Sequence, residues 1–269
     1  MYQAFYGFRE SPFNITPDPR FLFFSRRHRE AYDHLLFGIR ERKGFIQLTG
    51  EVGAGKTTLC RALLEDLGPG VKTALLLNPS LSGVQLLRSI LRELGLKYRG
   101  NDRMRCLDVL NQFLLEENVA GRDVVLIVDE AQDLSDELLE QVRLLSNLET
   151  DQRKLLQIVL LGQNELRDKL DQRKLRQLRQ RITVRYHLGA LSASETAAYV
   201  RHRLHVAGAK DPDLFTTLAI GRLHLYARGV PRLINAACDK ALLCGWVQNK
   251  TKLGLFQVEK AIRELEGRG

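Results

Sequence analysis

Residues 50–57 read Gly50-Glu51-Val52-Gly53-Ala54-Gly55-Lys56-Thr57 and match the pattern G-x-x-x-x-G-K-[ST]. Glycines at these spacings let backbone amides turn toward a phosphate group, and a helix beginning near Lys56 adds the positive end of its dipole. Lys56 supplies a point charge for the β- and γ-phosphates, and the Thr57 hydroxyl can ligate Mg²⁺. The residues expected to bind a nucleoside triphosphate are Gly50, Glu51, Val52, Gly53, Ala54, Gly55, Lys56, Thr57 and Thr58.

The segments around this loop alternate between short apolar strands and helices. Strands are expected at residues 45–49, 71–77, 124–128, 155–161 and 182–187. Helices are expected at about 26–42, where Ser25 can cap the first turn, and at about 56–67, 82–94, 103–117, 135–148 and 164–180. Apolar strands separated by helices are typical of a parallel sheet that is covered on both faces. The sequence therefore predicts an α/β P-loop fold with a five-stranded parallel sheet.

A different pattern follows the fifth strand. Ser192-Ala193-Ser194-Glu195 is a capping box that opens a helix to about residue 206. Further helices are expected at about 213–226, 231–247 and 255–266, and no strand pattern occurs among them. We therefore expect an α/β domain at residues 26–190, followed by a small all-α lid domain at residues 191–269.

The first 25 residues are rich in aromatic side chains and are interrupted by Pro12, Pro17 and Pro19. Proline at this density excludes a regular helix through the segment. Its aromatic residues, which need a buried surface, are Phe5, Tyr6, Phe8, Phe13, Phe21, Phe23 and Phe24. We expect residues 1–25 to form an N-terminal arm that lies across the α/β domain.

Composition excludes several classes of protein. With 44% apolar and 27% charged residues, the 269-residue chain is globular rather than disordered or fibrous. The longest apolar stretches, 124–128 and 158–161, are too short to span a bilayer, and the first residues lack a signal-peptide pattern. The four cysteines form neither a C-x-x-C pair nor a zinc pattern, so we expect reduced thiols: Cys60, Cys106, Cys238 and Cys244. The net charge of +9 suggests an anionic partner, such as a nucleotide, a nucleic acid or an anionic lipid.

A second motif supplies the acidic side chains that a nucleotide site needs. The expected strand at 124–128 is followed directly by Asp129 and Glu130. Asp129 would hold Mg²⁺ through water, which makes Thr57 and Asp129 the expected metal ligands, and Glu130 would polarise the attacking water. The Glu after the acidic Mg²⁺ ligand favours ATP hydrolysis over a GTPase switch, and no guanine-reading Asn-Lys-x-Asp motif occurs. The predicted ligands are therefore ATP and Mg²⁺.

The sequence resembles the AAA+ ATPases. The shared features are the phosphate loop, which is called Walker A in that family, the acidic pair after the third strand, which is called Walker B, and the helical lid. More narrowly, the sequence resembles the general secretion pathway A (ExeA-type) ATPases and related ATPases of pilus-biogenesis and exosortase loci. The resemblance covers nearly the whole chain. It rests on Phe5-Tyr6-Gly7-Phe8, Ser11-Pro12-Phe13-Asn14, Pro17-Asp18-Pro19, residues 48–59, Asp129-Glu130-Ala131-Gln132 and Leu161-Gly162-Gln163. Transposition-regulator ATPases share much of this pattern.

The resemblance implies roles for further residues. Gln163 matches the sensor-1 position, whose polar side chain contacts the γ-phosphate or its water, and the neighbouring Asn164 is the alternative. Asn78 matches a position that can hold the catalytic Glu inactive, although Asn-Pro also fits an ordinary turn. Arg232, just after Pro231, matches the sensor-2 arginine that ties the lid to the γ-phosphate, and a surface arginine is the alternative.

Arg179 and Arg181 match the position of an arginine finger, which reaches the nucleotide of a neighbouring subunit in a homo-oligomer. Arg181 is the preferred candidate, and a solvated basic helix is the alternative. The basic segment, residues 167–185, could contact DNA or an acidic partner. It carries two acidic residues, Asp168 and Asp171, against eight cations: Arg167, Lys169, Arg173, Lys174, Arg176, Arg179, Arg181 and Arg185.

The favoured function is ATP hydrolysis by an oligomeric AAA+ ATPase that drives assembly of a secretion or other cell-envelope machine. Such a protein would be cytoplasmic, would bind a protein partner of that machine, and could be recruited to the inner face of the membrane. The alternatives are a DNA-binding ATPase of transposition-regulator type and an ATP-gated scaffold with negligible turnover. Secretion-type relatives commonly continue into a membrane anchor and a periplasmic domain that binds the cell wall. Because the sequence contains neither, we expect this chain to be either part of a longer protein or a member of a soluble branch of the family.

Overall fold

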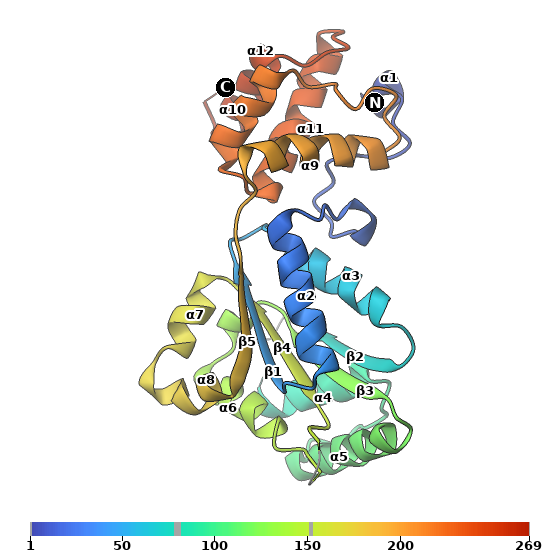
Figure 1. Cartoon of the computed structure of the whole chain (residues 1–269), viewed down its shortest axis with the longest axis vertical. Coiled ribbons are helices and arrows are strands. Elements are labelled where there is room, and N and C mark those ends of the chain that lie inside the picture. Colours follow the sequence, from blue (N-terminus) through green and yellow to red (C-terminus); the bar gives the residue numbers. More distant parts are fainter. Residues whose placement is uncertain (1, 78–81, 151–152, 269) are drawn as a thin grey trace. The chain divides into compact units, whose positions relative to one another are not determined.

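Five parallel strands form the sheet of the computed structural model, which describes residues 2–77, 82–150 and 153–268 (Figure 1). Their spatial order is β2 (Val71–Leu76), β3 (Asp123–Val128), β4 (Gln157–Gly162), β1 (Phe45–Gly50) and β5 (Ile182–Leu188). Every residue of β1 and β4 is buried, whereas the edge strands β2 and β5 alternate between buried and more exposed residues. This arrangement confirms the predicted five-stranded parallel sheet, and it places β1 between β4 and β5.

Helices cover both faces of the sheet. On one face, strand residues such as Leu126 and Ile158 share a core cluster with helix residues such as Leu86 and Leu139. On the other face, Gly38 lies so close to Ile46 that a Cβ at Gly38 would be 2.6 Å from the Ile46 side chain. The helices are α2 (Arg26–Arg40), α3 (Lys56–Leu67), α4 (Gly83–Glu93), α5 (Arg103–Val119), α6 (Asp136–Leu145), α7 (Asn164–Leu170) and α8 (Arg176–Arg181).

The prediction of a single basic helix at 164–180 was wrong. The segment consists of α7, a short 3₁₀ turn η3 (Arg173–Leu175) and α8. Its buried apolar residues are Leu166, Leu170, Leu175 and Leu178. A continuous helix turns about 100° per residue, so the five-residue step from Leu170 to Leu175 would rotate Leu175 by about 140° from the buried face. The break in the helix lets all four leucines reach the core.

The chain divides into two compact units. The helical unit comprises Met1–His28, Glu51–Leu59 and Gly189–Gly269, and the sheet unit comprises Arg29–Gly50 and Cys60–Leu188. In the helical unit, the capping box of Ser192 and Glu195 opens α9 (Ala193–Val206) as predicted. The other lid helices are α10 (Thr217–Ala227), α11 (Pro231–Val247) and α12 (Leu255–Leu265). The phosphate loop, residues 51–55, and the first turn of α3 belong to this same unit.

The N-terminal arm packs into the core of the helical unit, so the expectation that it lies across the α/β domain was wrong. It contains one helical stretch that was not foreseen, α1 (Tyr2–Tyr6), and a 3₁₀ turn, η1 (Pro19–Phe21). Tyr6, Phe8 and Phe13 are buried in one cluster with residues of the lid helices. The Tyr6 hydroxyl donates to the Lys250 carbonyl at 3.0 Å, and desolvation raises the pKa of Tyr6 to about 12.

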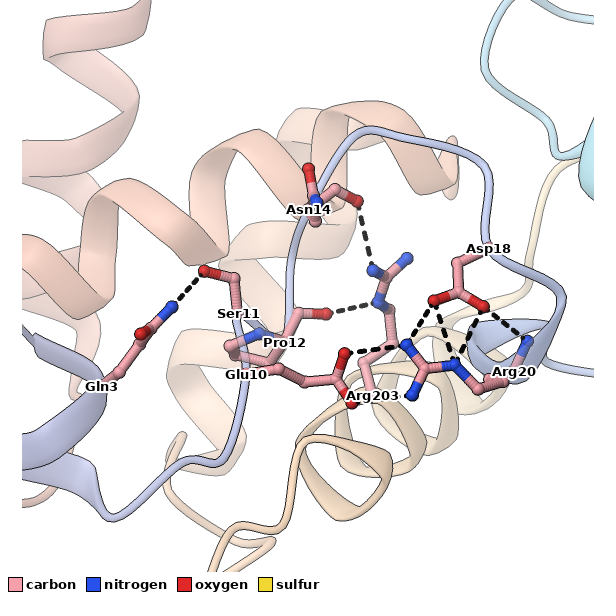
Figure 2. A network of polar contacts seen from close by, with 8 residues as sticks. All are labelled: Gln3, Glu10, Ser11, Pro12, Asn14, Asp18, Arg20 and Arg203. Atoms are coloured by element: carbon pink, nitrogen blue, oxygen red, sulfur yellow. Dashed lines mark hydrogen bonds and ion pairs between the residues drawn. The ribbon is translucent and has the colours of Figure 1, made fainter.

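Arg203 of α9 contacts the part of the arm that follows α1 (Figure 2). Its guanidinium donates to the carbonyl oxygens of Pro12 and, at 3.1 Å, of Asn14, and it lies 4.6 Å from the centre of the Phe21 ring. An extended segment without sheet partners leaves carbonyl groups that need donors when they are buried. The fork of five N–H groups on one arginine meets that need at two points at once.

Candidate functional site

The site begins where strand β1 ends, at Gly50 in the sheet unit. Gly50 pairs with Leu188 of β5, and a Cβ added to Gly50 would lie 2.6 Å from the Leu188 carbonyl oxygen. Only glycine allows this approach without a backbone shift. The first glycine of the motif thus has a packing reason in the sheet, which the sequence pattern alone did not reveal.

The phosphate loop, in the helical unit, has the backbone shape of a small anion cradle. Gly53 has φ of +76° and Gly55 has φ of +97°, both in the left-handed region that favours glycine. The Ala54 amide donates to the Glu51 carbonyl at 3.1 Å, and the Lys56 ammonium donates to the same carbonyl at 3.1 Å. Lys56 is only 6% exposed, whereas Val52 at the tip is 47% exposed. Thr57 and Thr58 follow in the first turn of α3.

Two residues next to the loop form hydrogen bonds with its carbonyl oxygens. The backbone amide of Arg232, at the start of α11, donates to the Gly53 carbonyl at 3.2 Å. A Cβ at Gly53 would lie 2.2 Å from the Arg232 Cβ, so Gly53 is required by its contact as well as by its φ. The second neighbour is His28, whose Nε2 lies 3.1 Å from the Ala54 carbonyl oxygen. The structure thus brings Arg232, a predicted site residue, next to the loop within one unit.

In the sheet unit, Asp129 and Glu130 follow the carboxyl end of β3. Asp129 is 3% exposed, and its Oδ1 accepts the backbone amide of Glu130 at 2.9 Å. Glu130 has φ of 49° and ψ of 43°, a left-handed conformation that costs a residue with a side chain about 1 kcal/mol. Backbone strain of this kind is concentrated at functional sites.

The carboxylate of Glu130 is held by two glutamine side chains. Gln132 donates through Nε2 to Glu130 Oε2 at 2.7 Å, and Gln163 donates through Nε2 to the same oxygen at 3.2 Å. The Gln163 backbone amide donates to Gln132 Oε1 at 3.1 Å, which closes the group. These residues meet because β3 and β4 are neighbouring parallel strands, so their carboxyl ends share one edge of the sheet. Gln163 was predicted, but Gln132 was not assigned a role in the sequence.

Asn164, the alternative to Gln163, is the first residue of α7. Asn78 lies outside the described residues. Among the described parts of the chain, no cluster of His, Cys, Asp and Glu could hold a metal ion by itself. All four cysteines are free thiols, and no helix in the described ranges is long and apolar enough to cross a bilayer.

The two candidates for the arginine finger lie on α8 and have different surroundings. Arg181 donates through Nη1 to Ser146 Oγ at 2.5 Å and is half-buried in its own chain. Arg179 is exposed and pairs with Asp171 at 3.3 Å. Within the basic segment, Lys169 donates to the Gln132 carbonyl at 3.0 Å, and Lys174 pairs with Asp136. The basic segment is therefore partly structural, with exposed side chains at Arg167, Arg173 and Arg176.

Comparison with known proteins places the chain among nucleotide-binding domains of one fold. A family model described as an AAA domain matches residues 39–170. General secretion pathway protein A of Aeromonas hydrophila is 47% identical over 268 residues, which is 99% of this chain and 49% of that protein. The chain thus spans about half the length of this curated relative.

Two solved structures show the same fold at low sequence identity. The Aeropyrum pernix ORC2 protein, solved as ADPNP-ADP complexes, has a TM-score of 0.70 and 19% identity over 96% of this chain and 72% of its own. The Aeropyrum pernix ORC1 protein in complex with DNA has a TM-score of 0.69 and 17% identity over 96% of this chain and 70% of its own. These matches confirm the α/β P-loop architecture followed by helices.

Proposed function

The chain is an AAA+ protein that is related over nearly its whole length to general secretion pathway protein A, and from this premise we propose that it binds and hydrolyses ATP with Mg²⁺. The observation that carries the proposal is the Glu130 carboxylate, which is half-buried at the sheet edge and oriented by Gln132 and Gln163. Two amide donors on one carboxylate oxygen fix the direction of that carboxylate, as a residue that orients a water requires.

The residues present fit a magnesium nucleotide. Gly53 and Gly55 adopt the left-handed backbone conformation that lets loop amides turn toward a phosphate, and Lys56 supplies a buried cation beside them. Thr57 and Asp129 would hold Mg²⁺, since hydroxyl and carboxylate oxygens are the ligands that this hard cation prefers. When bound, Mg²⁺ would neutralise charge on the phosphate oxygens. The remaining residues of 50–58 would bind the phosphates mainly through backbone amides.

Glu130 would accept a hydrogen bond from the attacking water and hold that water in line. Gln132 and Gln163 would fix the direction in which the carboxylate points, because both donate to Oε2. Gln163 would act as sensor 1, with Asn164 beside it as the alternative. Arg232 would act as sensor 2, which its position next to Gly53 supports. The role of Asn78 as a residue that holds Glu130 inactive stays a prediction.

The similarity to general secretion pathway protein A supports a role in assembly of a cell-envelope machine. We propose a homo-oligomer in which Arg181 or Arg179 of one subunit completes the site of the next. In this role the chain would act on the cytoplasmic side of the inner membrane with a protein partner of that machine.

Substituting Lys56 by Ala tests nucleotide binding directly. The variant should bind ATP about 100-fold more weakly, because loss of a charge-assisted contact to phosphate costs about 3 kcal/mol. Titration calorimetry with Mg-ATP measures this. Lys97→Ala, which removes an exposed lysine of the sheet unit, is the matched control and should keep wild-type affinity. Equal affinity for ATP in both variants would contradict the proposed phosphate loop.

DNA binding coupled to ATP is the second candidate function. The exposed Arg167, Arg173 and Arg176 favour it, and the ORC1 structure of the same fold was solved with DNA. If these three arginines contact phosphates, log K for a duplex should fall with log salt at a slope of about −2.7. Replacing all three by Ala should then abolish the salt dependence in a fluorescence anisotropy titration. No binding at about 50 mM salt would exclude this candidate.

A further inference from the structure

His28 lies at the third position of helix α2, inside the helical unit, and is 4% exposed. Both ring nitrogens have partners. Nδ1 lies 2.7 Å from Ser25 Oγ, and Nε2 lies 3.1 Å from the carbonyl oxygen of Ala54 in the phosphate loop. The same Ser25 oxygen also accepts the backbone amide of His28 at 3.2 Å, which caps the helix. One side chain thus links the start of α2 to the phosphate loop.

These contacts determine which nitrogen carries the proton. A carbonyl oxygen only accepts, so the bond to Ala54 requires a proton on Nε2. Nδ1 then accepts from the Ser25 hydroxyl, whose own lone pair receives the His28 amide. Every group is satisfied by the neutral ring. Burial lowers the pKa of His28 from its usual value, against smaller opposing effects of the Ala54 carbonyl and Glu195, and this agrees with a neutral imidazole.

The reason a phosphate loop needs such a contact lies in its backbone. Amides that turn inward toward an anion leave the adjacent carbonyl groups pointing outward, and a buried carbonyl needs a donor. The Gly53 carbonyl receives the Arg232 amide, and the Ala54 carbonyl receives His28. A Cβ at Gly55 would lie 3.3 Å from His28 Nε2, so the ring also limits the space behind the loop.

We propose that His28 is a positioning residue of the nucleotide site, which holds the phosphate loop in its anion-binding shape by donating from Nε2 to the Ala54 carbonyl. The proposal rests on the proposed function, because it assigns His28 to the same nucleotide site. His28 itself touches neither the phosphates nor the attacking water.

Three variants test the proposal by nucleotide affinity. His28→Ala should raise the Kd for both ATP and ADP about tenfold, since one hydrogen bond at the loop is worth about that factor. His28→Gln should restore most of the affinity, because its Nε2 can reach the Ala54 carbonyl, whereas the shorter His28→Asn should not. At saturating ATP, the turnover number of His28→Ala should stay within about twofold of wild type. His224→Ala, which removes a histidine bonded to Thr196 in the same unit, is the control and should leave Kd unchanged.

A second readout is independent of activity. In ¹⁵N-labelled wild-type protein, the His28 ring should show a directly bonded proton on Nε2 and none on Nδ1 at neutral pH. A proton on Nδ1, or an unchanged Kd in His28→Ala, would overturn the proposal even though nucleotide binds. If wild-type protein bound no nucleotide, the proposed function would fail, and the tautomer measurement would still decide whether His28 donates to the loop.

Discussion

Glu130→Gln should lower the rate of ATP turnover about 10³-fold, the range expected when a positioned general base is lost. Gln keeps the shape of the side chain but cannot take a proton from water. The amide group would also face the amide donors of Gln132 and Gln163, which now bond a carboxylate oxygen. ATP affinity should stay within a few-fold of wild type, because the phosphate loop is untouched. A steady-state phosphate-release assay together with an ATP titration separates the two effects.

The matched control is Glu165→Gln, the same chemical change at an exposed position of α7. It should hydrolyse ATP at the wild-type rate. Gln132→Ala adds information about orientation, because it removes one donor to Glu130 while leaving the carboxylate in place. Wild-type protein that turns over no faster than Glu130→Gln would contradict the catalytic role and would support an ATP-gated scaffold.

Loss of the arginine finger should lower turnover by about 10³-fold in an assembled oligomer. The structure makes it necessary to test both candidates, because Arg181 is bonded to Ser146 of its own chain and must break that bond to act in trans. Arg179 is exposed, and its surface ion pair with Asp171 presents little energetic obstacle. Arg176→Ala, on the same helix α8, is the control for loss of a basic surface charge. Turnover that stays at the wild-type level in Arg179→Ala, Arg181→Ala and the double variant would exclude both fingers.

Mixing experiments show whether an arginine acts in trans. An Arg181→Ala chain mixed with a Lys56→Ala chain should regain part of the activity, because the intact site of the first borders the intact finger of the second. Arg232 is expected to act in its own subunit, since its backbone amide bonds the phosphate loop of the same chain. An Arg232→Ala chain should therefore stay inactive when it is mixed with Lys56→Ala. Recovery in the second mixture and none in the first would reverse the two assignments.

The sequence alone determined the features that depend on neighbouring residues. The glycine and lysine spacing of residues 50–57 identified the phosphate loop because positive φ and the helix start are local properties. Apolar runs and caps such as Ser82, Ser135 and Ser192 located the helices and strands for the same reason. The resemblance to secretion ATPases also rested on short contiguous motifs, and the relationship over nearly the whole chain confirmed it.

Only the tertiary structure decided which distant residues meet. Gln163 reaches Glu130 because β3 pairs with β4, and strand order is set by packing of the whole sheet rather than by any single strand. The arm packs into the helical core, where its aromatic side chains are buried among lid residues and Arg203, far along the chain, donates to the carbonyl groups of Pro12 and Asn14. His28 reached Ala54 in the same way, since a buried carbonyl selects its donor by position in space, which local sequence spacing does not encode.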